Sequence, residues 1–316
     1  MENKMQTVVL ALGGNAITRV GERGTFPEQL KNIAKVAESI AELVIAGYRV
    51  LITHGNGPQV GNLLIKNELA KDVVPPMPLD VCVANTQGSL GYGIQQQLRN
   101  VLLEKGCEKE IVTFVTQVVV DPHDPAFYNP TKPVGPFYTA EEARQMEKTR
   151  GYRMVEDSGR GWRRVVPSPR PLAIVERKAI RKALEEGFVV IAAGGGGIPV
   201  VQDEKGHLKG VEGVIDKDLA AARLASDIGA DVLLMLTSVR KVIINFGRPG
   251  QKELDCMTVE EAKRYFKEGH FPPGSMGPKV EAAITFLEQG GQKAIIGLLE
   301  EAREALQGQA GTAIVH

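Results

Sequence analysis

The chain has 316 residues, enough for one large α/β domain or two closely joined lobes, and its composition is that of an ordinary globular enzyme. Its 38 Lys and Arg residues balance 38 Asp and Glu residues, so no overall field attracts nucleic acid or an anionic membrane, and we expect neither as a partner. Three well-separated cysteines without a CxxC pair indicate reduced thiols, and the lack of a signal peptide or a membrane-length apolar run predicts a cytoplasmic protein.

Strands and helices alternate along the first 120 residues. Residues 7–12 (TVVLAL) form an apolar run typical of a buried strand, and residues 28–46 carry apolar side chains at a helical period that Gly47 closes. The same patterns predict strands over residues 48–53 and 111–120 and a helix over residues 79–105. This alternation predicts a three-layer αβα sandwich with a mostly parallel central sheet.

Residues 121–171 interrupt the alternation. This segment holds eight of the 18 prolines, the only tryptophan (Trp162) and many Arg and Lys residues. A disordered linker would be poor in aromatic residues. We therefore predict a folded excursion from the sheet, which is either a lid subdomain or a plain surface insertion.

The alternation resumes after residue 171. We predict a helix near residues 172–186, a strand over 188–194, a helix from about Asp216, a strand over 231–237, an extended run over 242–247, helices near 258–267 and 278–289, and strands over 293–299 and 312–316.

Glycine is concentrated where the predicted strands end. Four such segments are LGGNA (12–16), HGNGPQVG (54–61), AGGGGIP (193–199) and GSMGPK (274–279). The carboxyl ends of strands form the ligand crevice of open α/β sheets, and glycine lets main-chain N–H groups approach an anion closely. One glycine-rich loop is weak support, but four together predict a phosphate or carboxylate site.

Two common nucleotide-binding folds are disfavoured. No GxxxxGK[ST] motif occurs, which excludes a P-loop NTPase. The first strand is followed by GGNA instead of GxGxxG, and no acidic residue ends a second strand to hold a ribose. A dinucleotide-binding dehydrogenase is therefore a poor fit.

Two lysines stand at predicted helix starts. Lys217 follows Asp216, which we interpret as an N-cap, and Lys279 follows Ser275 and Pro278. A positive side chain in the first turn opposes the helix dipole. Each lysine alone could equally be a solvated surface residue, but the recurrence beside glycine-rich or Asp-flanked turns predicts a phosphate clamp.

The sequence offers no metal-binding motif. His54 lies in the second glycine-rich segment, where a structural role is favoured, and the other histidines are scattered without ligand spacing. We therefore expect no metal held by protein side chains. The predicted cofactor is Mg²⁺ that arrives with ATP or ADP, held mainly by phosphates and water.

Six motifs together resemble one family over nearly the whole chain. They are ALGGNA (11–16), HGNGPQVG (54–61), RRVVPSPRP (163–171), AGGGGIPV (193–200), GVEGVIDKD (210–218) and GSMGPKV (274–280). The set is similar to that of the carbamate kinases in the amino acid kinase superfamily. The resemblance implies the amino acid kinase-like fold, with an N-terminal lobe over residues 1–210 that binds carbamate or carbamoyl phosphate, a lid insertion at about 121–171, and a nucleotide-binding lobe over residues 211–316.

The resemblance also implies roles for individual residues. Gly13, Gly14 and Asn15 would contact the transferred phosphoryl group, and Gly55, Asn56 and Gly57 would line the carbamate pocket. Lys217 and Lys279 would neutralise phosphate charge, Asp218 would hold both lysines, and Lys132 would reach over the substrate from the lid. The nucleoside side would involve Thr237, Ser238, Asn245, Phe246, Met276 and Lys279.

The implied activity is reversible phosphoryl transfer between ATP and carbamate, giving ADP and carbamoyl phosphate. The resemblance further implies a homodimer that works in arginine catabolism and forms ATP. Carbamate is already an anion, which explains why no general base stands out in the sequence. The nearest alternative is another superfamily kinase, such as one acting on acetylglutamate; a nucleotide-sensing domain without catalysis would not need Lys217, Asp218 and Lys279 together.

Overall fold

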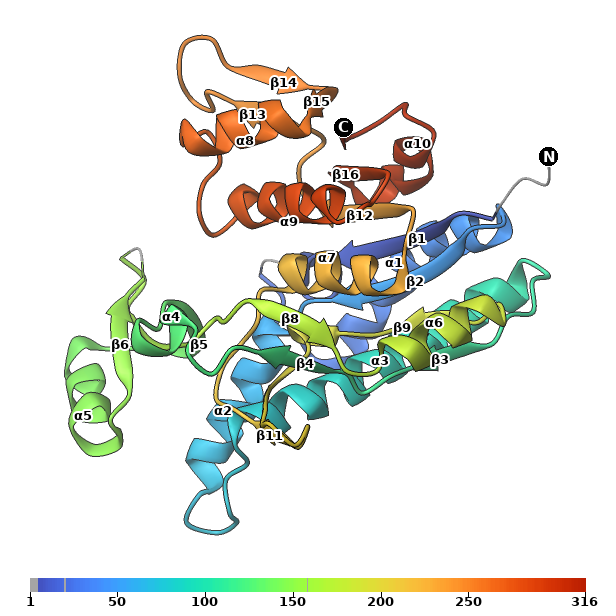
Figure 1. Cartoon of the computed structure of the whole chain (residues 1–316). Helices are drawn as coiled ribbons and strands as arrows, with labels where there is room; N and C mark the ends of the chain where they lie inside the picture. The colour runs from blue at the N-terminus through green and yellow to red at the C-terminus, as the bar shows by residue number, and fades with distance from the viewer. Residues whose placement is uncertain (1–4, 20, 158) are drawn as a thin grey trace.

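The computed structural model describes residues 5–19, 21–157 and 159–316. Its centre is an eight-stranded sheet with the order β15-β17-β16-β12-β1-β2-β9-β3 (Figure 1). Every neighbouring pair is parallel except β16 and β17, which are antiparallel. The predicted mostly parallel sheet is therefore confirmed.

The strands of this sheet are β1 (Thr7–Leu12), β2 (Arg49–His54), β3 (Ile111–Thr113), β9 (Val189–Ile191), β12 (Val232–Thr237), β15 (Cys256–Thr258), β16 (Lys293–Leu298) and β17 (Thr312–Val315). The larger helices are α1 (Phe26–Ile45), α2 (Gly57–Ala70), α3 (Leu79–Glu104), α6 (Arg177–Glu185), α7 (Lys217–Ile228), α8 (Val259–Lys267) and α9 (Met276–Glu288), followed by the short α10 (Ala302–Leu306).

Strand β1 shows why helices cover both faces of the sheet. All its residues from Val8 to Leu12 are at most 1% exposed, so neither face of the strand meets water. Val8 and Leu10 pack in a cluster with α1, α3 and α10, whereas Val9 and Ala11 pack in a cluster with α6, α7, α8 and α9. Successive strand residues point to opposite faces, so a continuous apolar run requires an apolar layer on each side. This arrangement confirms the three-layer αβα sandwich.

A smaller sheet lies beside the central one. Its order is β11-β10-β4-β8, formed by β4 (Gln117–Val120), β8 (Pro171–Ile174), β10 (Ile198–Gln202) and β11 (Leu208–Gly210). Two predicted elements are wrong here. Residues 111–120 are not one strand but β3 and β4 in different sheets, and residues 172–174 belong to β8, so that the helix begins only at Arg177.

Buried Thr116 accounts for the break between β3 and β4. Its N–H donates to Gln87 Oε1 at 2.8 Å, and its Oγ1 accepts a hydrogen bond from Ala193 N–H at 2.9 Å. Through these bonds Thr116 pairs with Gln87 and Ala193 instead of with a neighbouring strand of the central sheet. The surrounding residues are equally apolar in both strands, so the change of sheet leaves no trace in the hydrophobic pattern.

The interrupting segment is folded, as predicted. After the single-turn helix α4 (Pro125–Tyr128) it forms the antiparallel sheet β5-β7-β6 with helix α5, where the elements are β5 (Lys132–Tyr138), α5 (Ala140–Arg150), β6 (Arg153–Glu156) and β7 (Trp162–Val166). This subdomain projects from the body (Figure 1). Val134 and Val166 anchor it in a cluster with Val60 of α2 and Val83 of α3.

The remaining elements are short. They are the 3₁₀ turns η1 (Gly14–Ala16), η2 (Gly194–Gly196) and η3 (Leu299–Glu301), and the hairpin of β13 (Val242–Ile244) and β14 (Lys252–Leu254). Within the described residues, no helix is long and apolar enough to cross a membrane.

Candidate active site

A cleft of about 660 Å³ opens where β1, β12 and β16 end. Glycine-rich η1 forms part of its wall, together with the starts of α7 and α9. The lining residues are Gly13, Gly14, Ala16, Arg19, Lys35, Val36, Lys217, Leu236, Thr237, Ser238, Gly274, Ser275, Lys279, Leu298, Leu299 and Glu300. The cleft thus lies at the carboxyl ends of parallel strands, where open α/β sheets bind ligands.

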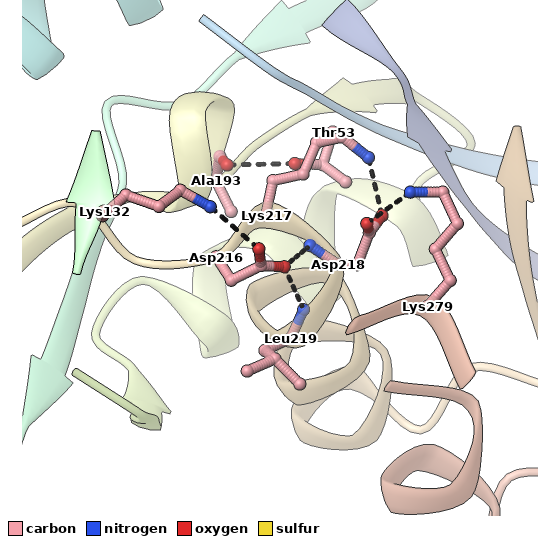
Figure 2. A network of polar contacts seen from close by, with 8 residues as sticks. All are labelled: Thr53, Lys132, Ala193, Asp216, Lys217, Asp218, Leu219 and Lys279. Carbon is pink, nitrogen blue, oxygen red and sulfur yellow. Dashed lines mark hydrogen bonds and ion pairs between the residues drawn. The ribbon is translucent and has the colours of Figure 1, made fainter. Parts of the chain in front are cut away.

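Two lysines in this cleft share one carboxylate (Figure 2). Lys217 Nζ lies 2.6 Å from Asp218 Oδ1, and Lys279 Nζ lies 2.8 Å from Asp218 Oδ2. The lysine side chains are 14% and 13% exposed, and that of Asp218 is 6% exposed. The structure therefore brings together the three residues that the sequence analysis singled out from two separate helix starts.

The charge state of Asp218 follows from this arrangement. Burial alone would raise the pKa of its carboxyl group, but the ammonium groups of Lys217 and Lys279 outweigh burial and lower the pKa to about 2. Asp218 is consequently ionised at neutral pH. One carboxylate between two ammonium groups leaves a net positive charge, which suits an anionic ligand.

Helix α7 carries its own N-terminal cap. Asp216 Oδ1 accepts hydrogen bonds from Asp218 N–H at 2.9 Å and Leu219 N–H at 3.4 Å (Figure 2). The predicted N-cap is confirmed. The two acidic residues also explain why Lys217 is tolerated in the first turn, since Asp216 and Asp218 supply negative charge at this helix end.

Lys132 reaches from the protruding subdomain to the same helix start. Its Nζ lies 3.0 Å from Asp216 Oδ2 (Figure 2). The lysine is the first residue of β5, so this strand of the protruding subdomain begins next to the start of α7.

Gly55 connects the first two glycine-rich segments. A Cβ atom on Gly55 would lie 3.5 Å from Gly14 N and 3.6 Å from Lys217 Cδ, in ordinary contact with both. Asn56 is the N-cap of α2, and its buried amide donates to Thr86 Oγ1 at 2.8 Å. Gly55 therefore lies directly behind Gly14 and Lys217, which line the cleft.

The third glycine-rich segment has a packing role that the sequence did not reveal. Gly194 and Gly195 are buried, and a Cβ atom would lie 2.5 Å from His54 Nε2 at the first and 2.2 Å from Asn56 Nδ2 at the second. Gly195 also has a φ of 69°. Glycine is required here because the turn packs directly against residues 54–56.

His54 is fully buried behind this turn. Burial lowers its pKa to about 4, so the imidazole is neutral at pH 7. Its Nδ1 lies 3.0 Å from Gly55 O, which assigns the proton to Nδ1 as donor. This geometry agrees with the structural role predicted for His54, because its ring binds the carbonyl group of Gly55, the residue that lies next to Lys217.

The predicted nucleotide-side residues are divided by the structure. Thr237 and Ser238 line the cleft after β12. Asn245 and Phe246 lie in the β13–β14 connection outside the lining, and Phe246 is 69% exposed. Met276 packs against the core while its neighbour Ser275 lines the cleft. Asn15 lies in η1 beside the lining glycines.

Arg19 and Lys35 line the cleft although the sequence analysis did not identify them. Arg19 stands four residues after Asn15, which is a weak local signal. Lys35 lies on α1, and in the sequence it cannot be told apart from the solvated charged residues of that helix. Among the described residues, no group of three or more His, Cys, Asp or Glu side chains could hold a metal ion.

Comparisons with known proteins identify the family of this chain. The model of the Amino acid kinase family matches residues 6–297. A carbamate kinase of Thermococcus kodakarensis is 54% identical, with 98% of this chain and 99% of the relative covered, and one of Pyrococcus horikoshii is 51% identical with the same coverage. The structure of carbamate kinase from Giardia lamblia bound to AMP-PNP matches with a TM-score of 0.93 and 46% identity over 99% of each chain. These likenesses confirm the predicted fold class. The chain belongs to the amino acid kinase family and, within it, to the carbamate kinases.

Proposed function

We propose that this protein is an ATP-dependent carbamate kinase that transfers a phosphoryl group reversibly between ATP and carbamate. The observation that carries the proposal is the pair of largely buried lysines on Asp218, facing a cleft that Gly13 and Gly14 line. Kinship with carbamate kinases at about half identity over nearly the whole chain supports the choice of acid.

The lysine pair acts as a phosphoryl clamp. Each ammonium group has three N–H donors and uses one on Asp218, so each keeps donors for phosphate oxygens. Asp218 holds the two like charges together before a ligand arrives, which spares the reorganisation that free lysines would need. The main-chain N–H groups of Gly13, Gly14 and Asn15 also contact the transferred phosphoryl group.

Carbamate binds next to this clamp in the proposed N-terminal lobe, residues 1–210. Gly55, Asn56 and Gly57 line its pocket, which is supported by the position of Gly55, where an added Cβ atom would contact Gly14 and Lys217. Lys132 covers the acid from the lid, residues 121–171. The proposed C-terminal lobe, residues 211–316, holds the nucleotide.

The nucleotide occupies the cleft beyond the lysines. Thr237 and Ser238 contact the nucleoside, as their place in the lining supports, and Asn245, Phe246 and Met276 contribute from the adjoining β13–β14 connection and the start of α9. The Giardia lamblia relative was solved with AMP-PNP, an ATP analogue.

The reaction needs no general base. An ionised carbamate oxygen attacks the γ-phosphorus of ATP, the bond from that phosphorus to the β–γ bridging oxygen breaks, and ADP leaves with the electron pair. Catalysis then consists of positioning and of charge stabilisation by lysines and backbone N–H groups. Neutral, buried His54 is consistent with this scheme, since it orients residues without taking a proton.

Mg²⁺ would arrive with the nucleotide. Asp218 already holds two lysines, so nucleotide oxygens and water are the fitting ligands for the ion. When bound, Mg²⁺ neutralises developing charge on the phosphates.

We further propose a cytoplasmic homodimer that makes ATP from carbamoyl phosphate during arginine catabolism. Exposed apolar side chains on α3 support self-association: Val81 is 41%, Tyr92 54% and Leu103 41% exposed. Phe26 of α1 is 42% exposed and stacks on Tyr92 with ring centroids 6.1 Å apart. Exposed aromatic side chains that lie together are common in protein interfaces.

A coupled assay tests the activity. The protein with ADP, Mg²⁺ and carbamoyl phosphate should form ATP, and acetyl phosphate under the same conditions serves as the acid control. Equal rates with both acyl phosphates, or no ATP above background, would contradict carbamate as the substrate.

A further inference from the structure

We propose that Asp216 is a positioning residue that fixes the lid lysine, Lys132, against the start of α7. The inference rests on the proposed function, since it assigns Lys132 to the acid substrate. It goes beyond the N-cap role of Asp216, because a cap requires only one carboxylate oxygen.

The two oxygens of Asp216 have separate partners. Oδ1 accepts from the N–H groups of Asp218 and Leu219 at 2.9 and 3.4 Å, which orients the first turn of α7. Oδ2 faces away from these amides and pairs with Lys132 Nζ at 3.0 Å (Figure 2). The carboxylate therefore bridges the helix that carries the phosphoryl clamp and the strand that carries the lid lysine.

The two partners differ in exposure. The side chain of Asp216 is 18% exposed, whereas that of Lys132 is 37% exposed, so the carboxylate is the more enclosed partner of the pair. Lys132 uses one of its three N–H donors on Asp216 and keeps the others. Asp216 can therefore hold Lys132 in place while the lysine binds a substrate oxygen.

The bridge also sets the charge of the substrate site. Lys132, Lys217 and Lys279 contribute three positive charges, and Asp216 and Asp218 contribute two negative ones, which leaves one positive charge. The carboxylates hold the three lysines close together without cancelling their attraction for an anion. Removing the charge of Asp216 frees Lys132 specifically, because Asp218 still binds the other two.

The lid position should depend on the same contact. Lys132 is paired with Val166 of β7 in the lid sheet, so anchoring the first residue of β5 anchors both strands. Other lid-to-body ion pairs lie away from the cleft, such as Arg150 with Glu68 of α2 at 3.0 Å. Asp216 supplies the anchor that joins the lid directly to α7.

Asp216→Asn separates the two roles. An asparagine has one oxygen, which can keep the cap, and its NH₂ group then faces Lys132 and cannot accept from it. We expect the KM for carbamoyl phosphate to rise about 10-fold, the scale of one charge-assisted hydrogen bond, with the KM for ADP nearly unchanged. Asp216→Glu should restore part of the loss.

A double-mutant cycle identifies the partner. Lys132→Met should raise the same KM, and the double variant should be no worse than Lys132→Met alone, because Asp216 acts through the lysine. Lys148→Met, on exposed lid helix α5, is the matched control and should leave both KM values unchanged. An unchanged KM in Asp216→Asn, or multiplying effects in the double variant, would overturn the proposal.

The lid itself gives a readout that does not need activity. Trp162 on β7 is the only tryptophan and reports the lid environment. In ligand-free Asp216→Asn and Lys132→Met, tryptophan emission should shift and trypsin should cut the lid faster than in the wild type. If the wild type makes no ATP, the proposed function fails, but these two measurements still test whether Asp216 anchors Lys132. Emission and cutting rates equal to those of the wild type in both variants would refute the anchor.

Discussion

The helices α7 and α9 begin alike in sequence but differently in electrostatics. Each has a lysine near its first turn, at Lys217 and Lys279. Helix α7 has the side-chain cap Asp216 and acidic Asp218 in its first turn. Helix α9 follows Ser275 without a side-chain cap and has no acidic residue in its first turn.

The difference shows that one helix supplies the carboxylate that pairs with both lysines. Asp218 of α7 pairs with Lys217 next to it in the chain and with Lys279, which lies 61 positions away. The start of α9 therefore lacks negative charge of its own and faces the cleft through Ser275. Helix ends without local anions favour anionic ligands, so α9 is the end that should respond most to phosphate.

Asp218→Ala should have the largest effect on stability and activity. It leaves two poorly exposed ammonium groups together without a carboxylate, which should cost about 3 kcal/mol of unfolding free energy and more than about 10²-fold in activity. Urea unfolding and the coupled assay measure both. A nearly stable, active variant would show that the lysines find other partners.

Lys217→Ala should lower kcat by at least about 10²-fold and leave the protein folded, because one transition-state donor is lost. Lys178→Ala, on helix α6, is the surface control for loss of a lysine. Turnover near that of the wild type would remove Lys217 from the clamp.

Acid should remove the stabilising effect of the Asp218 carboxylate. The folded pKa of Asp218, about 2, lies below its ordinary value of 3.8, so its contribution is complete above about pH 4 and is lost as pH falls toward 2. That shift corresponds to about 2 kcal/mol. The stability gap between the wild type and Asp218→Asn should therefore shrink from pH 5 to pH 2. A constant gap would mean that the carboxylate has no lowered pKa.

Ser275→Asp should give α9 the local anion that α7 already has. The new charge would repel ADP phosphates at the cleft wall, and we expect the KM for ADP to rise about 10-fold or less, by up to about 1.4 kcal/mol. Ser275→Asn matches the size without the charge and should bind ADP normally. Equal KM values for the two variants would place the phosphates away from α9.

The local sequence determined much of this protein. Apolar runs predicted strands such as β1 and β12, and the periodicity with Gly47 predicted α1, because burial and helix ends are encoded within a few residues. The cap Asp216 and the helix-start lysines were visible for the same reason. The resemblance then supplied the substrate, which charge and glycine alone left at the level of an acid.

Tertiary structure decided the strand ends and the pairing of charges. Thr116 divides residues 111–120 between two sheets through bonds to Gln87 and Ala193, which are remote in sequence. The third glycine-rich turn proved to be packing against His54 and Asn56, although its composition matches the loops that line the cleft.

The charges show the same limit. Lys132 meets Asp216 across 84 positions, and Lys279 meets Asp218 across 61. A sequence reveals that these residues are charged. Which charged residues pair with one another depends on the elements that the fold places side by side. Local patterns therefore predicted the helix starts, and only the packing of α7, α9 and β5 determined that two carboxylates hold three lysines around the start of α7.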